Sequence, residues 1–502
     1  MQSSKPISLT ALTLAAVIGA HSISANGAAQ QVLHVRDRST EGQNAANTAL
    51  VPSADGSFFG TAYGGSNGID TVYGDVVYKV TAQGAVSVVH QFTSAQQLTA
   101  GFNIYSNSDG VFVNGLMLAP DGNFYGTTAS GGPAGAGVIF RQKPDGSFAV
   151  LHTFEASPCC SQPNNGGAYP TLGPLALASD GFMYGTTASG GANGAGTLFK
   201  LGTDGSFAVL FSFAAGNALS NNVVAGQDGN FYTVQSGSVV KITPAGAWSV
   251  LYTAPQPASV DPGSLTRGRD GNLYATTSST LFKLSYAGTY SALHVFAPGP
   301  HQFVYVGYLY GWWEKTLMDI NAEGIGAVSL VQTADGNLYG SNLGGYSDAG
   351  TIFRFSPDGV FTTLFTFDAG QQPVYPRQTP GILADDGSGN LIAATRDNES
   401  AGHDLIYKIL PAAPLSVTAS FTKPNVKLWQ PTQLSWSSTN ASACSVHGDF
   451  SALQGSLPTS GTRSVTLYRK QARTDPAAFF AVVECTGSDG NTATATATLT
   501  IQ

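Results

Sequence analysis

The stretch DGNFYGTT at residues 121–128 decides the fold, because close copies of it return along most of the chain. The other copies are DGSFFGTA (55–62), DGFMYGTT (180–187), DGNFYTV (228–234), DGNLYATT (270–277), DGNLYGSN (335–342) and SGNLIAAT (388–395). Self-similarity at intervals of a few tens of residues is the mark of a repeat architecture. The chain is therefore predicted to consist mainly of seven copies of one structural unit.

Each copy contains more than the turn. A short apolar segment precedes it, and a glycine-rich loop follows it. Two further runs come next, such as GTLFKL (196–201) and FAVLFSF (207–213). Period-two alternation bounded by Gly, Asp and Pro is the signal of a β-strand. Four short antiparallel strands in each of seven units predict an all-β fold, a seven-bladed β-propeller.

The two ends of the repeat region predict how the ring closes. The last copy supplies only three strands before Pro411 and Pro414 mark a linker. The missing strand should resemble VLHTF (150–154), and QVLHV stands at residues 31–35. We expect this N-terminal strand to complete the last blade, since an open ring would leave an unpaired sheet edge. The propeller is thus assigned to residues 31–410.

The repeats resemble the GloVer tandem repeats of exported bacterial proteins, which are sometimes described as choice-of-anchor proteins. The resemblance is carried by the YGTT and GG pieces, by G-T-[LVI]-F-[KR] and by V-L-H-x-F, and it extends from about Gly56 to Ile409. It implies an exported protein, but it brings no established catalytic residue to transfer.

The sequence changes character after the linker. Residues 414–502 contain LSWSSTNASAC (434–444), VVECTG (482–487) and an alternating run at 492–501. This segment resembles a bacterial immunoglobulin-like domain, a β-sandwich of about 100 residues that acts as a spacer or adhesive module. Cys444 and Cys485 would form a disulfide within it, with Trp436 packed nearby.

The first residues have the layout of a secretory signal peptide. Lys5 precedes an uncharged apolar run at 7–20, and small residues follow. That run is shorter than the roughly 20 residues a membrane-spanning helix needs. We assign residues 1–25 to the signal peptide and expect no integral membrane segment after its cleavage. The mature protein should be extracellular, associated with the cell surface, or periplasmic.

The charge balance argues against nucleic acid as a partner, because 22 Lys+Arg face 30 Asp+Glu. No cofactor, metal site or catalytic residue is expected either. The Asp-Asp-Gly turn at 385–387 resembles a calcium loop but lacks the closing bidentate acid. Four histidines occupy the same fourth-strand slot in separate blades, where packing is the expected role: His34, His90, His152 and His294.

Cys159 and Cys160 are adjacent in a proline-rich segment. They could form a strained bridge with each other, form intermolecular bridges, or remain as thiols. We favour the adjacent bridge if these residues are oxidised.

The best candidate for ligand binding is an insertion at residues 297–326, after the fifth blade. Aromatic rings with nearby carboxylates suit a sugar or peptide ligand, although the rings could also pack down over a blade. The candidate ligand-binding residues are Tyr308, Tyr310, Trp312, Trp313 and Glu314.

Two classes of function remain open at this stage. The favoured class is an exported, non-catalytic propeller that binds a glycan, a peptide or a cell-surface partner, with the C-terminal domain as a spacer or adhesin. The alternative is a secreted hydrolase or lyase acting on a polysaccharide or small glycoside-like substrate. A propeller fold by itself does not distinguish them.

Overall fold

The computed structural model describes most of the chain after the leader. The described residues are 29–36, 48–64, 71–97, 105–155, 163–219, 221, 223–255, 259–296, 301–309, 312–319, 323, 325–343, 350–367, 378–397, 405–410, 416–427, 429–439, 441–450, 453–466, 478–487 and 492–501. The predicted signal peptide lies outside them, as do Cys159, Cys160 and Tyr310.

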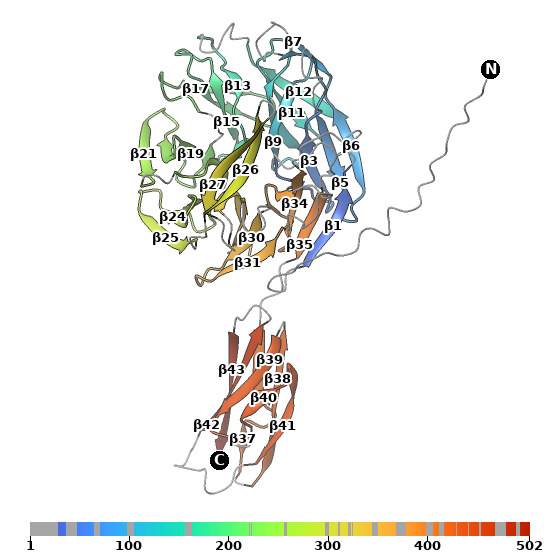
Figure 1. Ribbon diagram of the computed structural model, residues 1–502, viewed down its shortest axis with the longest axis vertical. Coiled ribbons are helices and arrows are strands. Elements are labelled where there is room, and N and C mark those ends of the chain that lie inside the picture. Colours follow the sequence, from blue (N-terminus) through green and yellow to red (C-terminus); the bar gives the residue numbers. More distant parts are fainter. Residues whose placement is uncertain are drawn as a thin grey trace, which may run out of the picture.

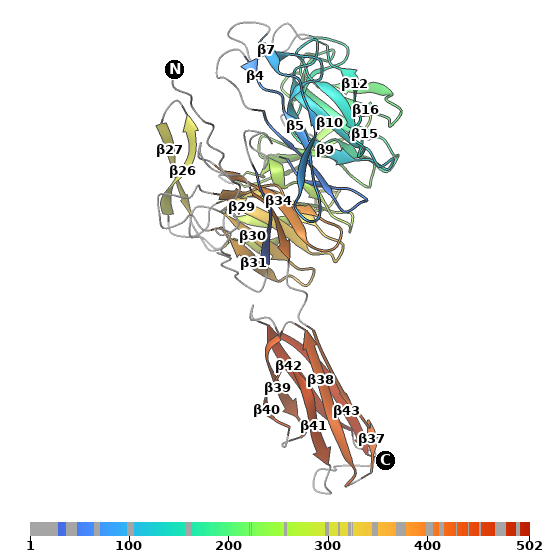
Figure 2. The same cartoon turned by 90° about the vertical axis from the view of Figure 1, so that its right-hand side faces the viewer.

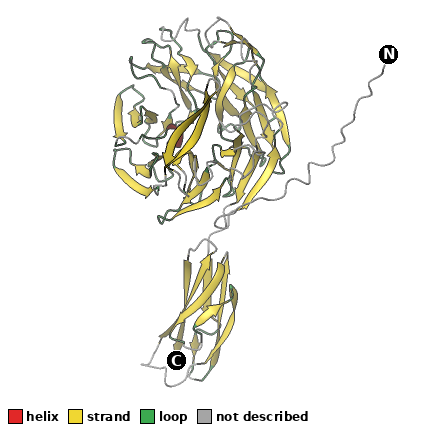
Figure 3. Ribbon diagram, viewed as in Figure 1, coloured by secondary structure: helices red, strands yellow, loops and turns green. Residues whose placement is uncertain are grey.

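Within this part of the chain the structure is all-β, as predicted (Figure 3). Its helical content is a single short 3₁₀ turn, η2 (Pro262–Ser264). No helix among the described residues combines the length and the apolar character needed to cross a bilayer.

Seven sheets of four or five strands, numbered I to VII here, are arranged around a common centre in the described structure (Figure 1). Sheet I consists of β2 (Val51–Pro52), β3 (Phe58–Ala62), β5 (Val76–Val80) and β6 (Val86–Gln91). Sheet II consists of β9 (Val111–Leu118), β10 (Phe124–Ser130), β11 (Val138–Gln142) and β12 (Phe148–Thr153). Sheet III consists of β13 (Ala168–Pro170), β14 (Ala176–Leu177), β15 (Met183–Ser189), β16 (Thr197–Leu201) and β17 (Phe207–Ser212).

Sheet IV consists of β18 (Val224–Ala225), β19 (Phe231–Gln235), β20 (Ser238–Ile242) and β21 (Trp248–Thr253). Sheet V consists of β22 (Thr266–Arg267), β23 (Leu273–Thr276), β24 (Thr280–Leu284) and β25 (Tyr290–Val295). Sheet VI consists of β28 (Ile325–Gln332), β29 (Leu338–Leu343), β30 (Thr351–Phe355) and β31 (Phe361–Thr366). Sheet VII consists of β32 (Gln378–Pro380), β33 (Ala384–Asp385), β34 (Leu391–Asp397), β35 (Leu405–Leu410) and β1 (Ala29–Val35). The arrangement is propeller-like.

The repeated stretch forms the turn between the first two strands of a sheet. In its best copy, Asp121 accepts the Asn123 backbone N–H at 3.1 Å and the Tyr125 hydroxyl at 2.7 Å. Gly122 has φ of 78°, which favours glycine. A Cβ on Gly126 would lie 2.5 Å from the Phe140 ring, so this position also requires glycine. The motif therefore encodes a turn, its cap and a close approach of two strands.

The apolar core lies between the sheets rather than within any one of them. Each of seven buried clusters combines side chains from two neighbouring sheets. Phe59 of sheet I, for example, stacks on Phe124 of sheet II with centroids 4.2 Å apart. Another cluster joins Tyr78 of sheet I to Ile406 of sheet VII. The set of contacts therefore runs around the whole ring.

The fourth-strand histidines also link neighbouring sheets. His90 stacks on Phe148 with centroids 3.6 Å apart, and His152 stacks on Phe207 at 3.7 Å. His294 repeats the arrangement on Phe361 at 3.9 Å. The prediction of a repeated packing position is confirmed for these three residues. Burial accordingly lowers the pKa of His152, because the charged imidazolium is poorly solvated there.

The N-terminal strand completes sheet VII, as the sequence predicted. β1 pairs antiparallel with β35, with Val32 opposite Tyr407 and Val35 opposite Leu405. The following residue, Arg36, is fully buried, and its guanidinium lies 4.8 Å from the centre of the Tyr78 ring in sheet I. The first described strand thus ties sheet VII to sheet I.

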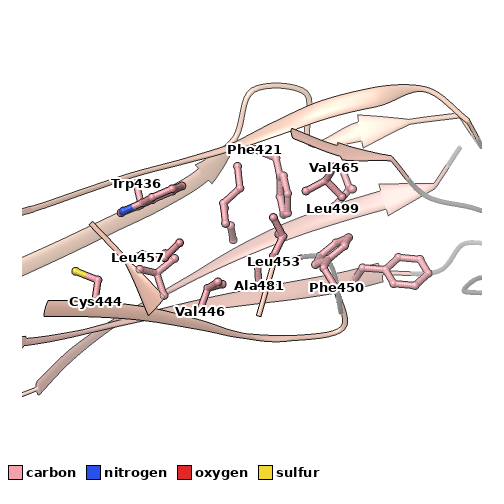
Figure 4. Packing of buried hydrophobic residues seen from close by; sticks show 14 of the residues in the cluster. Phe421, Trp436, Cys444, Val446, Phe450, Leu453, Leu457, Val465, Ala481 and Leu499 are labelled. Atoms are coloured by element: carbon pink, nitrogen blue, oxygen red, sulfur yellow. The ribbon is translucent and has the colours of Figure 1, made fainter. Parts of the chain in front are cut away.

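The C-terminal residues form a separate pair of sheets (Figure 1). One contains β36 (Ser416–Phe421), β38 (Pro431–Thr439) and β41 (Ser460–Thr466), and the other contains β37 (Asn425–Val426), β43 (Thr492–Ile501), β42 (Ala478–Gly487), β39 (Ala441–Gly448) and β40 (Gly455–Leu457). Figure 4 shows side chains from both sheets, including Trp436 and Leu499, meeting in one core.

Cys444 and Cys485 form the disulfide predicted from the sequence. The two cysteines face each other on the adjacent strands β39 and β42. The bond therefore joins two strands of one sheet and does not bridge the two sheets. Trp436 belongs to the same core cluster, and its indole N–H donates to the Pro458 carbonyl at 2.9 Å.

Removal of β1 should destabilise the whole ring. A chain that begins at residue 39 loses the β1–β35 pairing and the buried Arg36, whereas a chain that begins at residue 26 keeps both. We expect the shorter chain to melt at least about 5 °C lower, corresponding to a loss of a few kcal/mol. Thermal unfolding followed by circular dichroism measures the difference, and equal melting of the two chains would disprove closure by this strand.

Removal of the disulfide should destabilise the C-terminal unit. The bond closes a loop with a sequence separation of 41 residues, and chain entropy assigns such a bond about 4 kcal/mol. The double variant Cys444→Ser/Cys485→Ser should lose about that free energy of unfolding in urea titrations. Non-reducing peptide mapping should show a Cys444–Cys485 cross-link, and a peptide joining Cys159 or Cys160 to Cys444 would contradict the pairing.

Candidate functional site

One side of the ring, called the loop face here, gathers two kinds of connection. β4 (Thr71–Val72) lies between the second and third strands of sheet I, and it pairs with β7 (Ala95–Gln97), which lies between sheets I and II. β8 (Tyr105–Ser106) extends this small sheet. Connections within a sheet and connections between sheets therefore meet on the same side.

Two asparagines hold the connections of the loop face together. The Asn107 side-chain oxygen accepts backbone N–H groups from Gly110 and Gly132, both at 2.8 Å. Asn164 does the same for Gly167 at 2.7 Å and Gly191 at 2.9 Å. Each asparagine thus fixes a glycine-rich loop to the first strand of its own sheet. The signal for them, an Asn three residues before a Gly that precedes the first strand, is present in the sequence but weak.

An aromatic cluster lies on this face at the start of β9. Phe112 contacts Tyr63 and Tyr105 edge-on, with centroids 6.1 and 5.9 Å apart. All three side chains are half-buried. Phe112 has φ of 59°, and Tyr169 at the equivalent place in sheet III has φ of 58°. Aromatic residues rarely adopt this left-handed conformation, and such strain gathers at functional sites.

A buried carboxylate holds the unusual backbone of Phe112. Asp75 Oδ2 accepts the Val113 N–H at 2.8 Å, Oδ1 accepts the Gly64 N–H at 3.1 Å, and the Phe112 amide also donates to this carboxylate. At the next junction, the Tyr169 N–H instead donates to the Ala136 carbonyl at 2.9 Å. The second and third copies have Gly137 and Gly196 at the position of Asp75, whereas the seventh copy has another aspartate there, Asp404.

A second acid, Asp109, lies at the same junction. It accepts the Thr93 N–H at 3.0 Å, and its Oδ2 atom lies 3.4 Å from His90 Nε2, within ion-pair range but outside good hydrogen-bond geometry. Burial opposes its ionisation, yet the His90 and Thr93 groups together lower the pKa of Asp109. Both acids of this junction therefore order loops through their hydrogen bonds to backbone N–H groups.

The predicted insertion is not an irregular loop. It forms a hairpin of β26 (His301–Leu309) and β27 (Trp312–Asp319), whose register places Tyr308 opposite Trp313 and Gly307 opposite Glu314. Figure 2 shows this hairpin standing out from the ring on one side. Trp312 pairs with Leu309, so four of the five candidate binding residues belong to one hairpin, and Tyr310 lies outside the described residues.

Glu323 fixes the end of this insertion to the loop face. Its backbone carbonyl accepts the Asn342 side-chain amide at 2.9 Å and the Thr351 hydroxyl at 2.6 Å, both from sheet VI. Its carboxylate lies 3.1 Å from His294 Nε2 of sheet V. Asn342 and Thr351 flank the connection between the second and third strands of sheet VI. The hairpin therefore leaves the ring on the same face as the aromatic cluster.

The described residues contain no group of three or more His, Cys, Asp or Glu side chains arranged to hold a metal ion. At the predicted calcium-like turn, Asp386 instead accepts the Ser388 N–H at 2.8 Å and pairs with the Lys408 ammonium at 2.5 Å. The geometry there is that of the repeated turn.

Comparison with known proteins agrees with the repeat. Residues 94–236 match the family model of the Gloeobacter/Verrucomicrobia repeat. No curated protein sequence matches this chain. The region matched by the family model contains Tyr105 and Phe112 of the aromatic cluster, Tyr169 and both asparagines.

Several solved structures are similar at low identity. A streptogramin B lyase is 13% identical, with a TM-score of 0.47 over 76% of this chain and 97% of the other. Virginiamycin B lyase from Staphylococcus aureus, solved with quinupristin, is 14% identical, with a TM-score of 0.47 over 76% and 99%. The extracellular domain of a hybrid two-component system from B. thetaiotaomicron is 11% identical, with a TM-score of 0.46 over 94% and 57%. These similar structures include both enzymes and an extracellular domain of a two-component system, and at this level of identity none of them assigns an activity to this chain.

Asp75 should make stability depend on pH in an identifiable way. Burial raises the pKa of this carboxyl to about 6, from 3.8, against the opposing hydrogen bonds of Val113 and Gly64. Between these values the native state keeps a proton that the unfolded state releases, so the free energy of unfolding falls as pH rises. The contribution is about 3 kcal/mol, and Asp75→Asn should lack it in denaturation measured from pH 4 to 7.

Asp109→Asn provides the matched control, because the pKa of Asp109 is lowered and its contribution has the opposite sign. In the unmodified protein, ionised Asp109 stabilises the native state at pH values above the pKa of an unfolded aspartate, and this stabilisation is lost as the pH falls. Asp109→Asn should lack this contribution. Identical pH profiles for Asp75→Asn and the unmodified protein would show that Asp75 is not the group responsible.

Proposed function

We propose that the described sheets are the blades of a seven-bladed propeller at residues 31–410, followed by an immunoglobulin-like domain at 414–502. The chain would be exported after loss of residues 1–25. The cores shared by neighbouring sheets and the β1–β35 pairing support the blade count. The Cys444–Cys485 disulfide supports an oxidising destination, because such bonds persist outside the cytosol.

The function proposed for this protein is non-catalytic binding of a glycan or peptide on the loop face. The observation that carries it is the pair of left-handed aromatic residues, Phe112 and Tyr169, at equivalent places on adjacent sheets. A strained backbone persists only where its surroundings impose it, and here the Asp75 carboxylate does so at Phe112. Half-buried rings of this kind offer stacking surface to a sugar or to an aromatic side chain.

Two further features favour binding over hydrolysis or elimination. The two acids at this junction, Asp75 and Asp109, accept backbone N–H groups and are buried, so they are poorly placed to exchange protons with a substrate. The hairpin that carries Tyr308, Trp312 and Trp313 leaves the ring on the same face. We propose that the hairpin and the aromatic cluster bind one ligand together, with the C-terminal domain as spacer or adhesin.

Loss of aromatic rings on the loop face should weaken binding without unfolding the protein. Phe112→Leu keeps apolar volume but removes the ring, and Trp312→Ala/Trp313→Ala tests the hairpin. Each should weaken binding of a ligand found on glycan and peptide arrays by about tenfold, equivalent to about 1.4 kcal/mol. Affinity is measured by calorimetry, with melting temperature as the check on folding.

The matched control is Tyr290→Ala, which removes a 40% exposed aromatic residue from the outer strand β25. Its affinity should remain that of the unmodified protein. If all three variants bind the same ligands as tightly as the unmodified protein, the aromatic rings serve packing alone and the proposal fails.

A further inference from the structure

A second surface of interest lies in the C-terminal unit, at the turn formed by residues 427–430. The Gln430 backbone N–H donates to the Lys427 carbonyl at 3.0 Å, and the Gln430 side-chain oxygen accepts the Lys427 N–H at 3.1 Å. Trp429 occupies the third position of this turn with φ of 70°. Glycine or asparagine is the usual residue where a turn demands positive φ. A tryptophan at this corner is therefore not explained by the turn itself.

Trp429 is also exposed, with 62% of its surface accessible. The same unit buries Trp436 to 5% in its core. The core of this unit therefore contains the indole of Trp436, whereas the indole of Trp429 lies on a turn outside that core. Trp429 thus combines an exposed indole with a backbone conformation that is strained for tryptophan, and such strain gathers at functional sites.

The charged residues that the structure describes on the connection carrying Trp429 are both positive. Lys423 and Lys427 are both exposed on the same connection between β36 and β38. Among the described acidic residues, Asp449 lies nearest to this end of the C-terminal unit. Its carboxylate accepts a hydrogen bond from the Phe480 N–H at 2.9 Å. The whole chain carries a formal charge of −8. A small cationic surface on an acidic protein points to an anionic partner.

The position of this turn suits contact with an extended surface. Val426 pairs with Ile501, next to the C-terminus. Both views place that end of the C-terminal unit away from the ring (Figures 1 and 2). Attachment here would leave the loop face of the ring accessible to its ligand.

We propose that Lys423, Lys427 and Trp429 form a tip that binds an anionic lipid surface. Trp prefers the interface between headgroups and acyl chains, and each nearby Lys contributes to attraction by anionic headgroups. A ring on a protruding turn can enter that interface, whereas a polysaccharide is more often held along a groove or platform. The proposal concerns peripheral attachment and does not depend on which ligand the loop face binds.

The experiment measures sedimentation of the full-length mature protein with vesicles of phosphatidylcholine alone or with 30% phosphatidylglycerol, roughly the anionic content at which surface charge governs binding. Binding should require the anionic lipid. Trp429→Gly should reduce the partition coefficient by about tenfold, and Lys423→Gln/Lys427→Gln should do so by a similar factor.

Trp429→Gly also separates binding from folding, because glycine accommodates φ of 70° without strain. Its melting temperature should be equal to or higher than that of the unmodified protein while its lipid binding falls. Tyr290→Ala is the control for loss of an exposed ring elsewhere and should bind vesicles normally. Equal binding to both kinds of vesicle, unchanged binding by Trp429→Gly, or binding only to an anionic polysaccharide added in place of vesicles would each overturn the proposal.

Discussion

The structure depends on one constraint: the sheets of the ring have no cores of their own. Phe59 and Phe124, Tyr78 and Ile406, and His152 and Phe207 are all contacts between neighbouring sheets. A sheet removed from its neighbours would expose both apolar faces, so stability belongs to the ring as a whole. The repeated motif supports this arrangement locally: its turn joins the first two strands of a sheet, and Gly60, Gly126, Gly185 and Gly340 leave room for an aromatic ring on the third strand of the same sheet.

The local parts of the fold were accessible to sequence reasoning because they repeat. The DGNFYGTT stretch predicted turns and strands, and the shared slot of His90, His152 and His294 predicted packing instead of metal binding. Even the pairing of residues 31–35 with the last sheet could be inferred, because one missing strand had one candidate. The position of the disulfide within a single sheet could not, since it depends on which strands of the C-terminal unit become neighbours.

The candidate site was only partly accessible. The composition of the insertion singled out Trp312 and Trp313, but its hairpin register and its attachment through Glu323 arise from contacts with sheets V and VI. Phe112 and Tyr169 resemble ordinary strand residues in the sequence. Their left-handed backbone depends on Asp75 and on the Ala136 carbonyl, which lie tens of residues away in the chain. Sequence patterns reveal conformations that depend on residues close by in the chain, whereas the conformations of Phe112 and Tyr169 depend on residues that are close only in the folded structure.

The pairing of β1 with β35 also sets the order of events when the protein is made. Val35 is synthesised before any sheet of the ring exists, and its partner Leu405 emerges only when the ring is nearly complete. Until then β1 has no partner strand, and sheet I lacks its neighbour, sheet VII. Such non-local pairing slows folding and leaves strand edges open to other chains. The interval before residues 405–410 are made is therefore the period in which pairing with another unfinished chain competes most strongly with closure of the ring.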